Sequence, residues 1–132
     1  MHDETVLVVD DHSLVLNTLV NTLAHAGFRV LAASSGEEAL QLASRTEGRI
    51  ELAVCDVILP GMPGTELARR LTKIHPEIRC LFISGLPDHP GILQEIATTG
   101  QSLLPKPFLP HVLVRRAREI LGVRQRIMTA SA

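Results

Sequence analysis

Aromatic side chains are nearly absent from this sequence of 132 residues, which contains three Phe and neither Tyr nor Trp. Domains that stack nucleic-acid bases usually carry more aromatic rings. An excess of charge of one sign is also lacking, because 13 Lys and Arg nearly balance 14 Asp and Glu. This balance argues against bulk electrostatic binding to nucleic acid. We therefore expect no direct nucleic-acid partner and a core of aliphatic side chains.

Long apolar runs are missing too. No stretch reaches about 18 apolar residues, so we expect no membrane span. The amino terminus is acidic and shows no signal-peptide pattern. The two cysteines, Cys55 and Cys80, lie in apolar stretches without metal-ligand spacing. We interpret them as buried, reduced thiols, with a disulfide as the alternative. Together these features favour a cytoplasmic location.

The length is that of one domain. We expect residues 1–122 to form this domain and residues 123–132 to form a flexible C-terminal tail. We therefore expect no effector such as a DNA-binding module.

Short apolar segments alternate with segments of helical periodicity. Ser35 and Glu38 match a capping box, which marks the start of a helix. Strands are predicted at Thr5–Val9, 28–32, Glu51–Cys55, Arg79–Ile83 and Gln101–Leu104. Helices are predicted at about 12–26, from 35 onwards, and at about 65–74, 92–98 and 110–121. This alternation predicts a doubly wound α/β domain with a mainly parallel sheet.

Polar residues follow four of the predicted strands, where such folds bind ligands. They are Asp10 and Asp11, then Asp56, then Ser84, then Lys106. Adjacent carboxylates repel unless a cation lies between them, and oxygen ligands suit Mg²⁺. A cation, an ammonium and a hydroxyl around a carboxylate could hold a phosphoryl group. The central carboxylate could then attack phosphorus.

These residues occur in four motifs: Val8-Val9-Asp10-Asp11, the segment from Asp56 to Gly64, Ile83-Ser84-Gly85 and Lys106-Pro107-Phe108. In this combination the chain resembles the receiver domain of two-component response regulators over about residues 4–122. Among receiver domains, its motifs are most similar to those of hybrid sensor histidine kinases. The resemblance implies a flavodoxin-like (βα)5 fold with strand order 2-1-3-4-5.

The resemblance also implies the roles of the site residues. Asp56 would accept a phosphoryl group from a phosphohistidine on a histidine kinase or a histidine phosphotransfer domain. Asp11, Asp56 and the carbonyl of Ile58 would hold Mg²⁺, and Asp10 would bind through its water shell. Ser84 and Lys106 would contact the phosphoryl group, and Lys106-Pro107 would form a cis peptide bond. Such a domain catalyses only its own phosphorylation and dephosphorylation, so we do not expect an enzyme with an external substrate.

The chain departs from the family pattern at Leu103, where receivers usually carry an aromatic or histidine ring that moves with Ser84. This leaves the usual switch in doubt. Pro105 removes a backbone donor from the end of an edge strand. Pro87 and Pro90 suggest a short or displaced fourth helix.

Some residues receive plainer interpretations. We interpret His12 as the start of a helix, with a role as a ligand as the alternative. The arginines of the last helix give it a basic stripe, which we interpret as a solvated face, with an acidic partner or a homodimer contact as the alternative.

Other functions stay open beside the phosphoacceptor. The chain could be the receiver part of a hybrid sensor kinase or a phosphorylation-independent docking module. A phosphatase of the haloacid dehalogenase type would need two Asp separated by one residue after the first strand, whereas Asp10 and Asp11 are adjacent.

Overall fold

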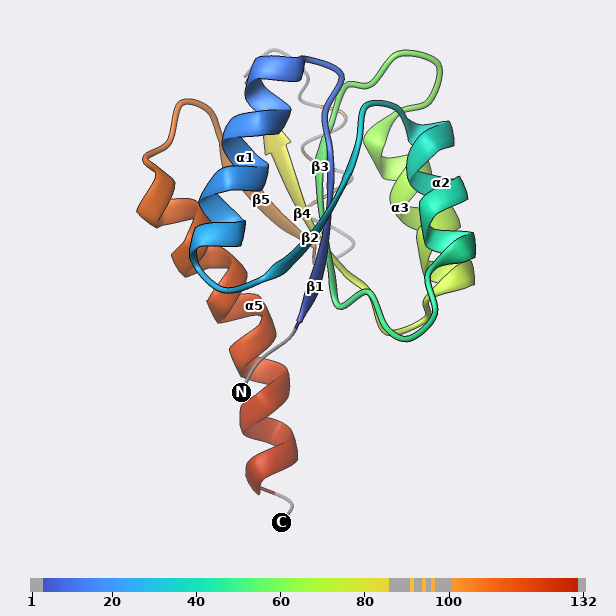
Figure 1. Ribbon diagram of the computed structural model, residues 1–132. Coiled ribbons are helices and arrows are strands. Elements are labelled where there is room, and N and C mark those ends of the chain that lie inside the picture. The colour runs from blue at the N-terminus through green and yellow to red at the C-terminus, as the bar shows by residue number, and fades with distance from the viewer. Residues whose placement is uncertain (1–3, 86–90, 92–93, 95, 97–100, 131–132) are drawn as a thin grey trace.

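Five parallel strands form one sheet with helices on both of its faces (Figure 1). The computed structural model describes residues 4–85, 91, 94, 96 and 101–130, and for residues 123–130 the backbone alone. On one face lie α1 (Ser13–His25) and α5 (Pro110–Ala130). On the other face lie α2 (Gly36–Arg45) and α3 (Gly64–Ile74). The result is a three-layer α/β arrangement.

The sheet has the strand order β2-β1-β3-β4-β5, which confirms the predicted topology. Each neighbouring pair is parallel. The strands span Thr5–Val9 (β1), Arg29–Ala33 (β2), Leu52–Asp56 (β3), Arg79–Ser84 (β4) and Ser102–Pro105 (β5). These bounds lie within one residue of the predicted ones. The order places β3 at the centre and makes β2 and β5 the edges.

The core follows from the alternation of side chains along the buried strands. All five residues of β1 are buried. Leu7 and Val9 belong to the cluster on the side of α2 and α3, whereas Val6 and Val8 belong to the cluster on the side of α1 and α5. A strand covered on both faces needs apolar residues at every position, which explains its uniform sequence.

The cysteines lie within this core. Cys55 and Cys80 are both free and buried, as predicted. Burial raises the pKa of Cys55 well above its usual range, and it raises the pKa of Cys80 to about 12. Both groups are therefore neutral thiols at physiological pH and act as small apolar side chains.

The start of α2 follows the predicted capping box with one change. The Oγ of Ser35 accepts a hydrogen bond from the Glu38 N–H at 3.1 Å, as expected of an N-cap residue. The Glu38 carboxylate, however, accepts from the N–H of Ser34 at 2.6 Å rather than from that of Ser35. The Glu38 side chain therefore bonds to the residue before the N-cap, not to the N-cap residue itself as in the usual capping box.

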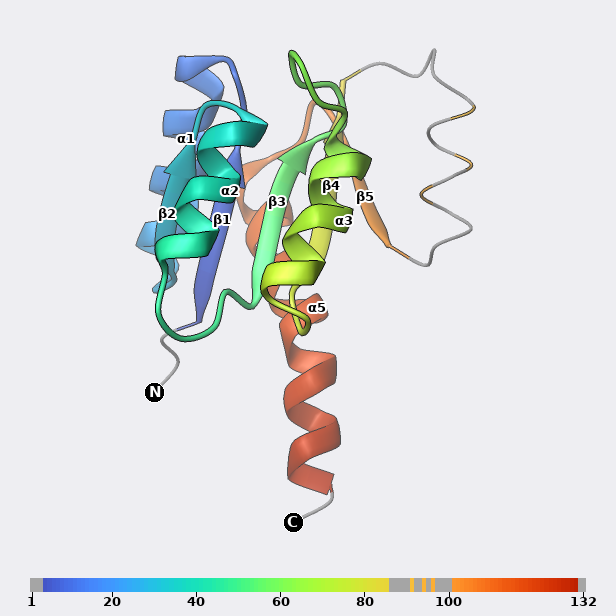
Figure 2. The ribbon, with the colours of Figure 1, turned by 90° about the vertical axis from the view of Figure 1, so that its right-hand side faces the viewer.

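The last helix differs from its prediction. The helix α5 continues to Ala130, whereas its predicted end lies near Leu121, with a tail after residue 122. Residues 123–130 contain no Gly or Pro to end a helix. Figure 2 shows this part of α5 extending past the sheet. Among helices in the described part of the chain, none has the length and apolarity needed to cross a membrane.

The fourth predicted helix, 92–98, lies mostly outside the described residues. Of its members only Gln94 and Ile96 are described, and both are helical. Ile96 is buried in the cluster on the side of α2 and α3. The expectation that Pro87 and Pro90 shorten or displace this helix concerns residues outside the described ranges.

Candidate functional site

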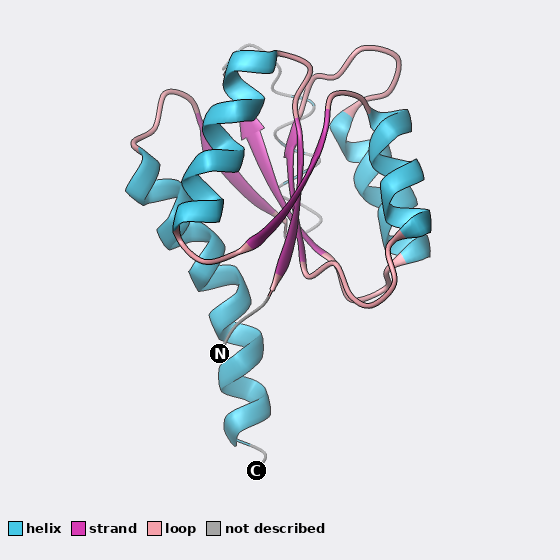
Figure 3. Cartoon of the chain, viewed as in Figure 1, coloured by secondary structure: helices cyan, strands magenta, loops and turns pink. Residues whose placement is uncertain are grey.

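The five parallel strands end at the same edge of the sheet (Figure 3), and the polar residues singled out in the sequence follow these strand ends. Parallel pairing sets them side by side. Val9 is paired with Cys55, so the following Asp10 lies beside Asp56. Ser84 at the end of β4 is paired with Pro105, so Lys106 follows on the outer side of Ser84.

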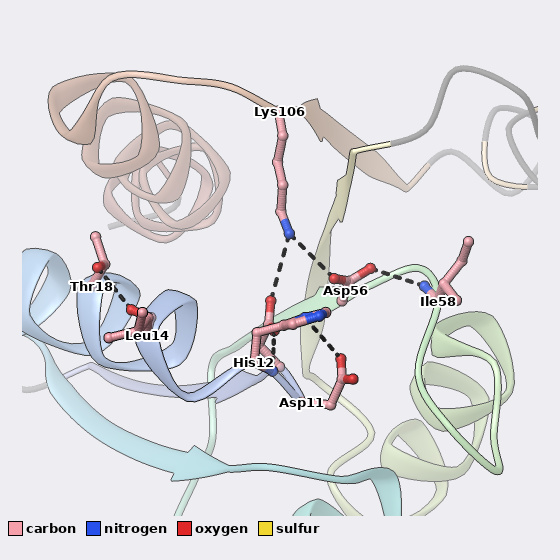
Figure 4. Close-up of polar contacts among 8 residues, drawn as sticks. Asp11, His12, Leu14, Thr18, Asp56, Ile58 and Lys106 are labelled. Atoms are coloured by element: carbon pink, nitrogen blue, oxygen red, sulfur yellow. Dashed lines mark hydrogen bonds and ion pairs between the residues drawn. The ribbon is translucent and has the colours of Figure 1, made fainter.

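Lys106 is the cation of this cluster. Its Nζ lies 3.3 Å from the Oδ2 of Asp56 and 3.7 Å from the Oδ2 of Asp10 (Figure 4). The two carboxylates are 12% and 1% exposed, and the lysine side chain is 26% exposed. Partial burial limits screening by solvent, so the ammonium holds both carboxylates in place.

Backbone N–H groups fix the other oxygen of each carboxylate. The Oδ1 of Asp10 accepts from the His12 N–H at 2.8 Å, and the Oδ1 of Asp56 accepts from the Ile58 N–H at 3.0 Å. In both cases an Asp side chain accepts a hydrogen bond from the N–H two residues later, which is a turn that Asp often forms. Each carboxylate therefore directs its Oδ2 toward Lys106.

Asp10 shows that the cluster is short of positive charge. Its Oδ2 is buried and makes no hydrogen bond. Burial raises the pKa of Asp10, and the charges of Asp56 and Asp11 add to this, while the His12 N–H and Lys106 act in the opposite direction. Three carboxylates face one ammonium here. A buried, unsatisfied carboxylate oxygen among oxygen donors fits a hard divalent cation such as Mg²⁺.

A cavity of about 370 Å³ opens over this cluster. Both Asp11 and the hydroxyl-bearing Ser84 line it. The lining residues are Asp11, His12, Asp56, Ile58, Leu59, Pro60, Ser84, Gly85 and Lys106. The cavity thus contains the acid, the hydroxyl and the ammonium that the sequence predicted at three different strand ends.

Two glycines that the sequence analysis assigned no role shape the site. A β-carbon on Gly64 would overlap the carbonyl oxygen of Asp56, and its N–H donates to the Val57 carbonyl at 2.9 Å. A β-carbon on Gly85 would lie 3.4 Å from the Cδ of Lys106. Gly64 lets α3 start against the end of β3, and Gly85 leaves room for the lysine stem. Their positions beside Asp56 and Ser84 in the quoted motifs are the signal that could have identified them.

The segment from Pro105 to Pro107 directs Lys106 into the cavity. The N–H of Lys106 donates to the carbonyl of Ser84 at 2.7 Å. The Lys106–Pro107 peptide bond is cis. From the end of β5 the lysine side chain extends toward Asp56 at the end of β3 (Figure 4).

Leu103 is not brought into this cluster. Its side chain is partly buried and packs on the core on the side of α2 and α3. Its carbonyl accepts a hydrogen bond from the Arg116 guanidinium on α5 at 3.2 Å. Leu103 therefore joins the edge strand to the core and to α5, away from the carboxylates.

Comparison with known proteins agrees with this arrangement. The chain matches the family model of the response regulator receiver domain over residues 6–118. It is 36% identical over 117 residues to the sensor kinase CckA of Brucella abortus, a match that covers 89% of this chain. The chain spans only 12% of the length of CckA.

Solved structures show the same likeness. The receiver domain of the hybrid histidine kinase CckA is 32% identical with a TM-score of 0.74, and the match covers 89% of this chain and 98% of that one. A CheY-like receiver protein of Methanospirillum hungatei is 25% identical with a TM-score of 0.85, and the match covers 95% and 98% of the two chains. The chain therefore belongs to the response regulator receiver domains of two-component signalling.

Proposed function

We propose that Asp56 is the phosphoacceptor of this receiver domain and takes its phosphoryl group from a phosphohistidine of a partner protein. The observation that carries this is the position of Lys106, whose Nζ lies between the Oδ2 atoms of Asp56 and Asp10. An ammonium beside a partly exposed carboxylate, at the base of a cavity, suits a nucleophile that receives a dianionic group.

In the transfer, a carboxylate oxygen of Asp56 forms a bond to phosphorus as the bond between phosphorus and the histidine nitrogen breaks. The electron pair of that bond stays on the imidazole. The bond leaves an acyl phosphate on Asp56, with negative charge on the phosphoryl oxygens. Lys106 is close enough to pair with one of these oxygens, and we assign Ser84 as a hydrogen-bond donor to another.

Asp10, Asp11, Asp56 and the Ile58 carbonyl would hold Mg²⁺. Bound there, Mg²⁺ supplies positive charge beside the phosphoryl oxygens. The unsatisfied Oδ2 of Asp10 and the excess of carboxylates over ammonium groups support this assignment. The protein's own contribution is to hold these oxygens in place through the backbone contacts of Asp10 and Asp56.

The output step would differ from that of receivers with a ring at position 103. Leu103 has no polar edge to exchange between solvent and core, and its side chain already packs inward. We propose that this domain passes its phosphoryl group on, or signals through another surface, without a ring movement. The likeness to the receiver of a hybrid kinase favours a kinase or a phosphotransfer domain as partner.

Three exposed apolar side chains follow the strand ends that form the site. Leu14 is 81% exposed, Ile58 is 43% exposed and Leu109 is 61% exposed. They lie just after Asp11, Asp56 and Lys106 in the sequence, so any protein that brings a phosphohistidine to Asp56 covers this edge. We refer to Leu14, Ile58 and Leu109 as the apolar rim and propose that it contacts the phosphohistidine partner.

Two free, buried thiols further support a location in a reducing cytoplasm.

The first experiment measures phosphorylation without a protein partner. The chain is incubated with Mg²⁺ and acetyl phosphate, and intact mass spectrometry detects the adduct. We expect one phosphoryl group on the wild type, none on Asp56→Asn and none with EDTA, while the exposed Glu37→Gln control is labelled normally. An unchanged wild-type mass would favour a docking module, and steady release of phosphate from general monoesters would favour a phosphatase.

The second experiment separates the apolar rim from the chemistry. Leu14→Ser and Leu109→Ser are compared with Ile74→Ser, which lies at the end of α3 and is 38% exposed. With a phosphorylated histidine phosphotransfer domain as donor, we expect the rim variants to react at least about fivefold more slowly, since a lost apolar contact costs roughly 1 kcal/mol or more. With acetyl phosphate all three should match the wild type. If the rim variants reacted equally slowly with both donors, the apolar rim would not be a contact for the phosphohistidine partner.

A further inference from the structure

His12 is placed among the carboxylates although it is not among the metal ligands that the family resemblance implies. It is the N-cap residue of α1, yet its side chain makes no capping hydrogen bond. Its Nδ1 lies 3.4 Å from the Oδ1 of Asp11 and 3.5 Å from the Oδ1 of Asp10 (Figure 4). The ring is 70% exposed, so its nearness to these two oxygens does not come from burial in the core.

The three side chains also have the spacing of a ligand set. One donor atom from each of Asp10, Asp11 and His12 lies within 4.8 Å of the other two. Donors that bind one small divalent ion at about 2.0–2.3 Å lie at most about 4.6 Å apart, so little movement would close this set around an ion. The buried Oδ2 of Asp10 makes no hydrogen bond, and its one cationic neighbour among the described residues, the Nζ of Lys106, is 3.7 Å away, so this oxygen still has room for a metal cation.

We propose that the Nδ1 of His12 is a direct ligand of the divalent cation at this site, beside Asp11. The proposal rests on the cation site of the proposed function and adds one nitrogen to a set of oxygens. Mg²⁺ takes oxygen ligands almost exclusively, whereas imidazole favours Mn²⁺, Co²⁺ and Zn²⁺ to an increasing degree. His12 therefore raises the affinity for these ions relative to Mg²⁺ and makes metal choice a property of this chain.

The test uses Mn²⁺ alone as the probe, on the full chain with any affinity tag removed. Pulsed EPR detects the ¹⁴N coupling of an imidazole bound to Mn²⁺, which a nearby but unbound ring does not produce at that strength. We expect this coupling in the wild type and its loss in His12→Gln. The control is His111→Gln, because His111 is an exposed histidine near the start of α5 and should leave the coupling intact.

Titration calorimetry gives the second measurement. We expect His12→Gln to weaken Mn²⁺ binding at least roughly tenfold, since even outer-shell partners of a metal ligand are worth that much, and to change Mg²⁺ binding by less than about twofold. A wild-type Mn²⁺ complex without ¹⁴N coupling, or a coupling that survives in His12→Gln, would overturn the proposal. Labelling of Asp56 by acetyl phosphate with Mg²⁺ would still succeed in that case, so failure of the His12 assignment is distinct from failure of the proposed function.

Discussion

Gly64 lies directly against Asp56, so that a β-carbon at residue 64 would overlap the carbonyl oxygen of Asp56. The backbone of β3 cannot yield easily, because β3 is paired on both sides. The close approach joins the start of α3 to the strand that ends in the proposed phosphoacceptor.

This contact predicts the effect of Gly64→Ala. The added methyl group must push α3 away from β3, and we expect a loss of about 1–3 kcal/mol in the free energy of unfolding. Urea denaturation measures it. The matched control is Gly122→Ala in α5, where a β-carbon meets no atom within 4 Å; a helical Gly→Ala change there should be neutral or stabilise the protein by up to about 1 kcal/mol. Equal effects at the two positions would contradict the overlap.

Asp10→Asn should stabilise the metal-free protein. Burial raises the pKa of Asp10, so its folded form resists ionisation more than its unfolded form. Stability is therefore lost as the pH rises from the ordinary value of 3.8 through the raised pKa, and this loss is complete above it. In EDTA at pH 7 we expect a gain of about 1 kcal/mol, the size of a typical stabilising substitution.

The pH dependence provides the check on Asp10. Below pH 3.8 the carboxyl is protonated in both states, and the advantage of Asp10→Asn should disappear. Asp11→Asn, at a side chain that is 28% exposed, should give a smaller gain. An Asp10→Asn protein that is less stable than the wild type at pH 7 would show that the contact with Lys106 outweighs the cost of burial.

Leu103→Ala should reduce stability without affecting phosphorylation. Leu103 packs on the core and lies away from the carboxylates, so we expect a loss of about 2 kcal/mol, at the low end for a leucine that is only partly buried. Labelling by acetyl phosphate at a temperature where the variant is folded should equal that of the wild type. Leu109→Ala, at an exposed side chain, should change stability by no more than about 0.5 kcal/mol. A labelling defect in Leu103→Ala would place this residue in the site.

Removal of residues 123–132 tests the predicted domain boundary. In the part of α5 whose side chains the structure describes, the buried residues are Leu113, Ala117 and Leu121. We expect the shortened chain to unfold with a free energy within about 1 kcal/mol of the wild type, since both described core clusters lie within residues 6–121. Circular dichroism should record the lost helix. A loss of several kcal/mol would mean that the domain extends beyond residue 122.

How well an element or a site residue could be predicted depended on the kind of signal that it leaves in the sequence. Strands such as β1 were predicted because a strand buried on both faces needs apolar residues throughout. Ser35 was identified as a cap because a hydroxyl before a helix has a local partner in the Glu38 N–H. The convergence of Asp10, Asp56 and Lys106 followed from parallel strand ends and the family motifs, although the strand order itself came from the resemblance.

What was missed depends on contacts between segments or on weak stop signals. The overlap at Gly64 requires the position of β3 relative to α3, which periodicity does not give. The contact of His12 with Asp11 depends on the local turn that Asp10 forms with the His12 N–H. The predicted end of α5 is too early because residues 123–130 contain no helix-ending residue and include the good helix formers Arg124, Gln125 and Met128.

The order of the strands also has a consequence for the growing chain. Lys106 directly follows β5, which is the last strand in the sequence and an edge of the sheet. During synthesis the amino-terminal part emerges first, so Asp10, Asp11 and Asp56 leave the ribosome before the ammonium that stands beside them in the finished fold. The carboxylates acquire that partner only when β5 pairs with β4. A nascent chain that has not yet reached residue 106 therefore lacks this lysine, so the proposed phosphoryl site is complete only after β5 has been added.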